Sequence, residues 1–314
     1  MLTFYRKRKI LSITLSIFAL LVIGSGIYVY SIYNSVENTV EQIHEPITRE
    51  KSEKRVEEVK FVERDPISIL LLGVDERKND RGRSDTIIVI TVNPNDQSMR
   101  MVSIPRDTRT EIIGRGFDDK INHAYAYGGV EMAMDTVENF LDIPIDYFIK
   151  VNMESFKDIV DAVGGVTVNN DFAFNYSGYT FNEGEITLDG KAALAYSRMR
   201  YEDPRGDFGR QDRQKQIIQA VIEKGATFST LSKFNNILAI IGDNIKTNLT
   251  FDDMVDIQAN YKDARHSLEK LQVNGSGTMI NGIYYLVVPE ENRTTLSATL
   301  QEHLSIDSKN ITAK

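Results

Sequence analysis

The chain has 314 residues, 41% hydrophobic and 26% charged, a composition typical of a globular protein with a sizeable core. Its net charge of -8 argues against bulk nucleic-acid binding, which needs a dominant basic surface, so any basic binding site must be local. The sequence contains no cysteine, which excludes disulfides, thiolate catalysis and zinc–thiolate sites.

The N-terminal segment has the pattern of a retained signal anchor. Residues 1–9 end in four basic residues, and residues 10–33 form an uncharged, largely apolar run long enough to span a bilayer as a helix. Basic residues before a span hold that end in the cytoplasm, and a cleaved signal peptide would have a shorter apolar core. The sequence therefore predicts a cytoplasmic tail, a single transmembrane helix in the cell membrane and an extracellular remainder.

The next segment, residues 34–65, is rich in Glu, Lys and Arg and poor in large apolar residues. We expect it to form a charged, partly helical stalk without chemistry of its own. The globular domain is expected to start near Pro66 and to include residues 66–314.

Three segments of strand length open this domain. Residues 67–74 (ISILLLGV) are almost continuously apolar, and residues 86–92 (TIIVITV) are rich in β-branched side chains. Residues 99–104 (MRMVSI) follow a turn over residues 93–96. The simplest arrangement is an antiparallel meander. The end of the first strand, the start of the second and the end of the third then share one edge of the sheet.

Charged residues flank the strands at this shared edge, namely Asp75, Arg77, Arg83, Asp85, Arg106 and Asp107. Asp85 shares a strand face with Ile87 and Val89, so we expect its carboxylate to start on a face that otherwise belongs to the core. One alternative is that these loops are charged because they are wet, and that Asp85 forms a structural ion pair with Arg83 or Arg106. Six charged residues at one edge favour a functional site.

The segment YSRMRYEDPRGDFGRQDRQKQ, residues 196–216, is rich in arginine within an acidic chain. Arginine binds phosphate oxygens with a planar, bidentate fork. From Gly209 the pattern becomes helical, and the apolar stripe of Ile217 continues back through Gln214 and Arg210. These two side chains therefore extend the buried face at a helix N-terminus, which favours an anion.

The remaining arginines of interest, Arg198 and Arg200, are two residues apart in what the sequence indicates is extended chain, so they can point the same way. The anion implied by these arginines is compact, multiply charged and phosphate-like. Its charge beside Asp75 and Asp85 predicts a hard divalent cation, most simply Mg²⁺, between carboxylate and phosphate oxygens.

These motifs resemble those of the LytR-CpsA-Psr family of Gram-positive cell-wall proteins. The resemblance rests on LLGVDER, GRSDTIIV, SIPRDT, KINHAYAYGG, DAVGGV, LDGKAALAYSRMR and GDFGRQDRQKQ, which follow in this order over residues 67–216. Within the family, the chain is most similar to the enzymes that attach wall teichoic acid. The resemblance implies a single α/β/α sandwich domain with a mixed central sheet.

The resemblance also implies a function. It indicates transfer of a glycopolymer from an undecaprenyl diphosphate carrier to the 6-hydroxyl of a muramic acid residue in peptidoglycan, with Mg²⁺, or Mn²⁺ in its place, as cofactor. The family's acidic, metal-binding pair corresponds to Asp75 and Asp85, which with Arg83 form the expected catalytic set. The residues expected to bind the diphosphate are Arg77, Arg83, Arg106, Arg198, Arg200, Arg210, Gln214 and Asp207.

Other residues receive more ordinary interpretations. His123 could contact substrate, but a single histidine is more often structural. Tyr125 and Tyr127 could meet a sugar or a prenyl chain, although packing is the commoner use of such residues. The pairs Gly128-Gly129 and Gly164-Gly165 are interpreted as turns. Apolar stretches such as residues 237–241 could line a groove for the lipid, although core packing is the commoner use of such a pattern.

Two alternatives to a phosphotransferase stay open on the sequence. A hydrolase acting on the same lipid-linked diphosphate would use water in place of the sugar hydroxyl. A non-enzymatic lipid-binding regulator of the envelope would need only the binding site. Direct gene regulation is disfavoured, because only about nine residues precede the predicted span.

Overall fold

The structure, a computed structural model, describes residues 41–76, 82–152, 155–225 and 245–306, together with Glu37 and Thr39. None of the helices in these ranges is long and apolar enough to cross a membrane. The predicted span, Arg77 and the apolar stretch 237–241 lie outside the described residues.

The centre of the fold is a sheet of six strands with the order β11-β6-β1-β2-β3-β12. The strands are β1 (Ile67–Val74), β2 (Ser84–Asn93), β3 (Ser98–Ser103), β6 (Tyr147–Asn152), β11 (Ile245–Thr247) and β12 (Leu268–Gln272). The predicted meander is confirmed, because β2 pairs antiparallel with both β1 and β3. The pairs β1–β6 and β3–β12 are parallel, so the sheet is mixed, as expected.

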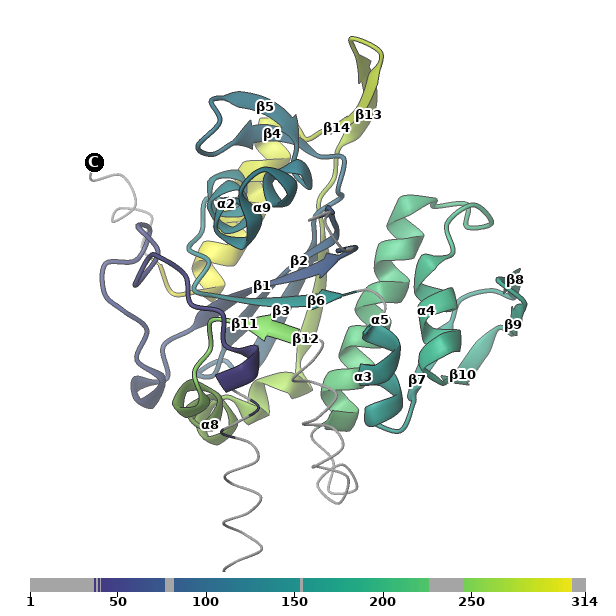
Figure 1. Ribbon diagram of the computed structural model, residues 1–314, viewed down its shortest axis with the longest axis horizontal. Helices are drawn as coiled ribbons and strands as arrows, with labels where there is room; N and C mark the ends of the chain where they lie inside the picture. The colour runs from purple at the N-terminus through teal and green to yellow at the C-terminus, as the bar shows by residue number, and fades with distance from the viewer. Residues whose placement is uncertain are drawn as a thin grey trace, which may run out of the picture.

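Helices cover both faces of this sheet (Figure 1). On one face, α2 (His123–Leu141) and α9 (Glu290–His303) pack over alternate residues of the strands, including Leu72 and Val89. On the other face lie α5 (Asp207–Gly225) and α8 (Phe251–Asn260), which pack toward Ile88 and Ile90. Successive strand residues point to opposite faces, so a strand covered on both sides is apolar throughout.

A smaller cluster of elements extends beyond α5. It contains α3 (Phe156–Ala162), β7 (Val166–Asn170), β8 (Phe174–Tyr176), β9 (Tyr179–Phe181), β10 (Gly184–Leu188) and α4 (Gly190–Arg198), which share a second apolar core. Two hairpins, β4 (Arg109–Ile112) with β5 (Phe117–Lys120) and β13 (Ser276–Ile280) with β14 (Ile283–Val287), project beside α2 and α9 (Figure 1). Short 3-10 turns span Phe61–Glu63 and Lys262–His266.

Two expectations about glycine pairs have different outcomes. Gly164 and Gly165 adopt positive φ angles of 81° and 79° directly after α3, which confirms a turn. The turn predicted at Gly128-Gly129 is wrong, because both residues lie inside α2. Gly129 kinks this helix with φ 71° and ψ -152°, a conformation that is essentially restricted to glycine.

The segment before β1 packs against the domain over much of its length. Ile43 is buried, and Arg49 Nη1 donates a hydrogen bond of 2.6 Å to Oε2 of Glu138, a residue of α2. Arg55 forms two hydrogen bonds with Asp146, which precedes β6. The sequence predicts a charged stalk over residues 34–65; in the described part of this segment, Arg49 and Arg55 instead pair with carboxylates of the domain.

Candidate active site

The predicted site lies at the edge of the sheet where β1 and β3 end and β2 begins. Arg106 follows β3, and its Nη1 donates to Asp85 Oδ1 at 2.9 Å. Burial works to lower the pKa of Arg106, but the charges of Asp85, Asp107 and Asp207 together raise it. The ion pair weighed in the sequence analysis therefore exists, and its partner is Arg106.

A β-bulge places Asp85 at this edge. Gly73 pairs with Thr86 and Val74 pairs with Ser84, so Asp85 is the unpaired extra residue on β2. A bulge interrupts the alternation of faces and re-aims the side chain of the extra residue. The Asp85 side chain is 39% exposed, so it reaches the surface at this edge. Its spacing from Ile87 had predicted a position on the core face, and that prediction is wrong.

The first turn of α5 supplies the second half of the site. Arg210 Nη2 lies 2.7 Å from Asp207 Oδ1, and Arg200 Nε lies 3.8 Å from the same oxygen. Burial lowers the pKa of the Arg210 guanidinium, and the nearby charges of Arg106 and Arg200 act in the same direction. The guanidinium groups of Arg106, Arg200 and Arg210 thus act on one another as like charges, an arrangement that an anion would stabilise.

Unsatisfied buried polar atoms mark the same edge. The Nε of Arg210 is buried and has no hydrogen-bond partner among the described residues. The same is true of further buried side-chain oxygens, which have no hydrogen-bond partner in the part of the chain that the structure describes: those of Ser84, Ser103, Thr108, Asn122 and Gln211. Such atoms are few in folded proteins, and a bound water, ion or ligand is one way in which they gain a partner.

The other predicted residues are placed as follows. Asp75 and Arg83 are exposed and adjacent, since the Asp75 N–H donates to the Arg83 carbonyl at 3.4 Å. Arg198 ends α4 and is exposed. The extended chain expected there is wrong at Arg198, because the Asp189 side chain caps α4 at its N-terminus and the helix extends to Arg198. Extended backbone begins only at Met199.

Two arginines of the basic segment have structural roles. Arg213 is buried and forms an ion pair of 2.6 Å with Asp203, which is also fully buried. Arg205 lies within 3.4 Å of carboxylate oxygens of Asp203, Asp212 and Asp171. Both arginines are already paired with carboxylates, so neither is expected to bind an anion.

An apolar cavity of about 210 Å³ adjoins this arginine cluster. It lies between the β1–β2–β6–β11 part of the sheet and the helices α3 and α5, with a mostly aliphatic wall that includes Ile218 and Ile222. Gln214, which is buried as predicted, lines the cavity one helical turn after Arg210. The helix α5 thus connects Arg210 with the apolar cavity.

The edge also contains residues that sequence reasoning did not assign. Lys120 Nζ lies 2.6 Å from Asp107 Oδ1, next to Arg106. His123 Nδ1 lies 2.7 Å from Asp119 Oδ2, which also accepts a hydrogen bond from Tyr127. The sequence signal that could have identified these residues is their motif, KINHAYAYGG. In the structure, the junction between β5 and α2 within this motif places the Asn122 N–H 3.4 Å from the Arg106 carbonyl.

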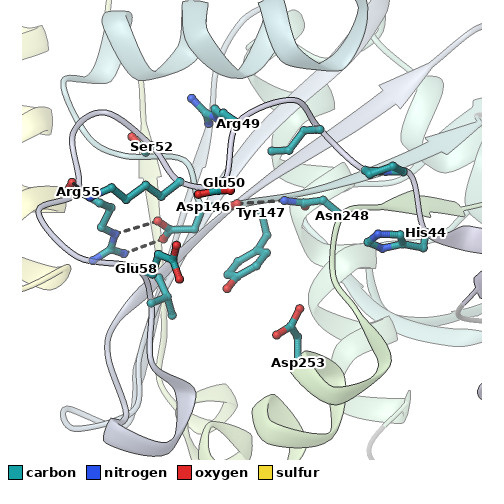
Figure 2. Close-up of a pocket in the computed structure, with 14 residues that line it drawn as sticks. His44, Arg49, Glu50, Ser52, Arg55, Glu58, Asp146, Tyr147, Asn248 and Asp253 are labelled. Atoms are coloured by element: carbon teal, nitrogen blue, oxygen red, sulfur yellow. Dashed lines mark hydrogen bonds and ion pairs between the residues drawn. The ribbon is translucent and has the colours of Figure 1, made fainter.

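A second cavity, of about 340 Å³, lies at the opposite edge of the sheet, where β1 and β6 begin. Figure 2 shows Arg55 directed at the Asp146 carboxylate, and Asn248 donating a hydrogen bond to the Asp146 carbonyl, just before β6. The cavity contains none of the predicted site residues. Two arginines that line this cavity, Arg49 and Arg55, form ion pairs with the carboxylates of Glu138 and Asp146.

The residues at the predicted site also fit a divalent cation. Asp75 and Asp85 offer hard oxygen ligands, which Mg²⁺ prefers, and they flank the ends of two paired strands. No group of three or more His, Cys, Asp or Glu side chains suited to a metal occurs among the described residues. Mg²⁺ is commonly held by one or two carboxylates together with substrate phosphates and water, so two carboxylates suffice.

The chain is similar to several known proteins. The chain is 56% identical over 300 residues to the polyisoprenyl-teichoic acid--peptidoglycan teichoic acid transferase TagU of Bacillus subtilis (strain 168), covering 95% of this chain and 97% of that protein. The crystal structure of B. subtilis TagU superposes with a TM-score of 0.63 at 54% identity, over 76% of this chain and 97% of that one.

A more distant structure carries a ligand. The LytR-CPS2A-psr family protein YwtF (TagT), solved with bound octaprenyl pyrophosphate lipid, superposes with a TM-score of 0.67 at 30% identity, over 84% of this chain and 100% of that chain. The model of the LytR_cpsA_psr family matches residues 30–302. With most of its length matched by the family model and by close relatives, the chain belongs to the LytR-CpsA-Psr family.

Proposed function

We propose that this protein is a phosphotransferase that moves wall teichoic acid from an undecaprenyl diphosphate carrier to the muramic acid 6-hydroxyl of peptidoglycan. One observation carries the proposal: the Nε of Arg210 is buried without a hydrogen-bond partner among the described residues, one helical turn before Gln214, which lines the apolar cavity. A polyprenyl diphosphate has the matching chemistry, with a charged head and an aliphatic tail. The named activity of the TagU relatives and the lipid bound to YwtF support the same substrate.

The arginine cluster would bind and orient the diphosphate. Arg106, Arg200 and Arg210 converge from the end of β3 and the start of α5, and Arg83 adds a cation from the start of β2. Charge-assisted hydrogen bonds to phosphate are about twice as strong as neutral ones, and phosphoryl transfer depends mainly on positioning and on neutralising charge. Arg77 and Arg198 stay predictions as further diphosphate ligands.

Asp75 and Asp85 would hold Mg²⁺ against the diphosphate. Bound there, the cation would neutralise charge on the transferred phosphoryl group. Asp85 is also the proposed proton acceptor for the attacking hydroxyl. Arg106 now occupies its Oδ1, and a phosphate that recruits Arg106 would free this oxygen for the proton.

The proposed location is the outer face of the cell membrane. Residues 10–33 would anchor the chain, with residues 1–9 in the cytoplasm and the catalytic domain outside. The undecaprenyl carrier and the peptidoglycan acceptor are both accessible to a domain held there.

The test supplies lipid-linked teichoic acid and Mg²⁺, with and without a peptidoglycan acceptor. A transferase joins polymer covalently to the glycan. Release of free phosphorylated polymer at one rate with or without acceptor would instead establish the hydrolase. Asp85→Asn should abolish transfer yet keep much of the lipid binding, because the arginines remain. Asp75→Ala should lower activity and recover part of it in excess Mg²⁺ or Mn²⁺.

A further inference from the structure

In-line phosphoryl transfer places the attacking and leaving oxygens on opposite sides of the phosphorus atom. In the proposed reaction the leaving group is the polyprenyl phosphate. Its tail would lie in the apolar cavity between the sheet and the helices α3 and α5. The acceptor hydroxyl must therefore approach from the other side of the arginine edge. That side is the sheet face covered by α2 (Figure 1).

The α2 side of the edge carries a connected cluster of polar and aromatic side chains. Asp119, in β5, accepts hydrogen bonds from Tyr127 Oη at 2.8 Å and from His123 Nδ1 at 2.7 Å. The rings of His123 and Tyr127 meet edge to face at 6.0 Å. Arg115 lies over the Tyr127 ring at 4.8 Å, and Phe117 meets that ring edge to face at 6.0 Å. These contacts fix the Tyr127 ring while leaving it accessible.

The cluster is exposed enough to bind a ligand. Tyr127 is 36% exposed and Phe117 is 47% exposed. His123 retains 20% of its side-chain exposure. Because a carboxylate only accepts hydrogen bonds, Nδ1 of the neutral ring carries the proton and Nε2 is left as an acceptor for a hydroxyl. A flat aromatic face beside a hydroxyl acceptor suits a sugar ring.

The cluster also adjoins the proposed diphosphate ligands. The backbone N–H of Asn122, the residue before His123, donates to the Arg106 carbonyl at 3.4 Å. The hydrogen bond to Asp119 raises the pKa of Tyr127, and the charges of Arg115 and Arg83 oppose this rise. The Arg106 backbone therefore connects the cluster to the proposed diphosphate site.

We infer that Tyr127, His123 and Phe117, held by Asp119, form the subsite for the acceptor glycan of peptidoglycan. The inference rests on the proposed function. The Tyr127 ring supports a sugar ring, and His123 Nε2 accepts a hydrogen bond from a sugar hydroxyl. The 6-hydroxyl oxygen then bonds to the phosphorus as the bond to polyprenyl phosphate breaks, and its proton passes to Asp85. His123 and Tyr127 are positioning residues in this scheme.

Steady-state kinetics with two variable substrates test the subsite. The acceptor is an uncross-linked peptidoglycan oligosaccharide, and the donor is lipid-linked teichoic acid. Tyr127→Ala should raise the acceptor KM about tenfold, and His123→Ala by a similar factor, the loss expected for one aromatic contact or hydrogen bond. The donor KM and octaprenyl diphosphate affinity should stay within about twofold, since both depend on the arginine cluster.

Tyr127→Phe serves as the matched control, because it keeps the ring and loses only the bond to Asp119. Its acceptor KM should lie between those of the wild-type protein and Tyr127→Ala. An unchanged acceptor KM in folded Tyr127→Ala and His123→Ala, or an equal rise in the donor KM, would overturn the subsite. Wild-type protein that transfers no polymer would instead refute the proposed function, so the two failures are distinguishable. Circular dichroism spectra establish that each variant is folded.

Discussion

Arg210 and Arg205 are five residues apart in one segment, yet they have different environments. Arg205 is paired with three carboxylates, whereas Arg210 has its Nε buried without a partner among the described residues. Composition could predict that this segment attracts anions. It could not separate the two arginines, because each has an Asp within three residues in the sequence, and Asp171, which also pairs with Arg205, is 34 residues away.

The contrast gives a prediction for diphosphate binding. Arg210→Ala should weaken octaprenyl diphosphate binding about tenfold or more, because a hydrogen bond to a charged group contributes about 1.5–3 kcal/mol. Arg205→Ala is the matched control and should change binding by less than about twofold, since exposed ion pairs contribute little. Isothermal titration calorimetry measures both. Equal losses in the two variants would contradict the assignment of Arg210 to the anion site.

The buried pair of Arg213 and Asp203 holds the arginine-bearing loop in place. Arg213 also donates to the carbonyls of Tyr196 and Met199, so it joins α4, the loop and α5. Gly209 packs against the pair so closely that a Cβ there would lie 1.7 Å from Asp203 Oδ2. Burial would raise the pKa of Asp203, but hydrogen bonds from Arg213 and the Arg205 N–H outweigh it and lower this pKa.

Removing this carboxylate should destabilise the fold in a pH-dependent way. Asp203→Asn should lower the free energy of unfolding by about 3–5 kcal/mol at neutral pH, because it leaves Arg213 buried and unpaired. A lowered pKa contributes stability above the unfolded value of about 3.9, and that stability is lost as pH falls through the folded pKa. Urea unfolding at about pH 7 and about pH 3 should therefore show a smaller difference from wild type in acid. A difference that does not depend on pH would show that the Asp203 charge is unimportant.

At the scale of elements, sequence patterns predicted β1, β2, β3 and α5 but missed local irregularities. Alternation placed Asp85 on a core face, and the bulge between Gly73 and Val74 brings it to the edge instead. A bulge depends on pairing with a neighbouring strand, which a single strand's pattern does not contain. The helix α4 was missed because its last turn contains Arg198, which looked like part of an extended, charged loop.

The cavity between the sheet and α5 is a further property of packed elements. Its aliphatic walls look like ordinary core in the sequence, and only the spacing between the layers leaves about 210 Å³ open. The apolar stretch named in advance for a lipid groove, residues 237–241, lies outside the described residues, so that prediction stays open. The observed cavity wall comes instead from β1, β6 and α5, including Leu71, Ile149 and Val221.

Filling the cavity should separate lipid binding from phosphate binding. Val221→Trp should exclude part of the prenyl tail, and each methylene kept out of an apolar site forfeits about 0.8 kcal/mol. Two excluded methylenes would weaken octaprenyl diphosphate binding about tenfold. Binding of inorganic pyrophosphate, measured by the same calorimetry, should not change. Unchanged octaprenyl diphosphate binding would place the tail elsewhere.

For the whole molecule, the mixed sheet and its two covered faces could be predicted, while the N-terminal boundary could not. Buried strands are recognised by their apolar runs, and the family motifs implied the layers. The charged residues 43–65 resembled a solvated stalk because the partners of Arg49 and Arg55, namely Glu138 and Asp146, lie about 90 residues away in sequence. Composition does not show such long-range pairing.

The proposed anchor gives a prediction about topology. In intact protoplasts of a Gram-positive host expressing the chain, added protease should remove the domain, because residues 34–314 are proposed to lie outside. A cytoplasmic protein serves as the control for membrane integrity. If the domain is fully protected from an active protease in intact protoplasts, the external location is refuted.

The central claim is that one edge of the sheet binds a lipid diphosphate, with its head on the arginines and its tail in the adjoining cavity. A crystal structure of this protein with octaprenyl diphosphate and Mg²⁺ tests it most directly. The account predicts phosphate oxygens within hydrogen-bond distance of Arg106, Arg200 and Arg210, the cation on Asp75 and Asp85, and the tail along α5. Diphosphate bound instead in the cavity lined by Arg55 and Asp146, with Arg210 still lacking an anion, would contradict it.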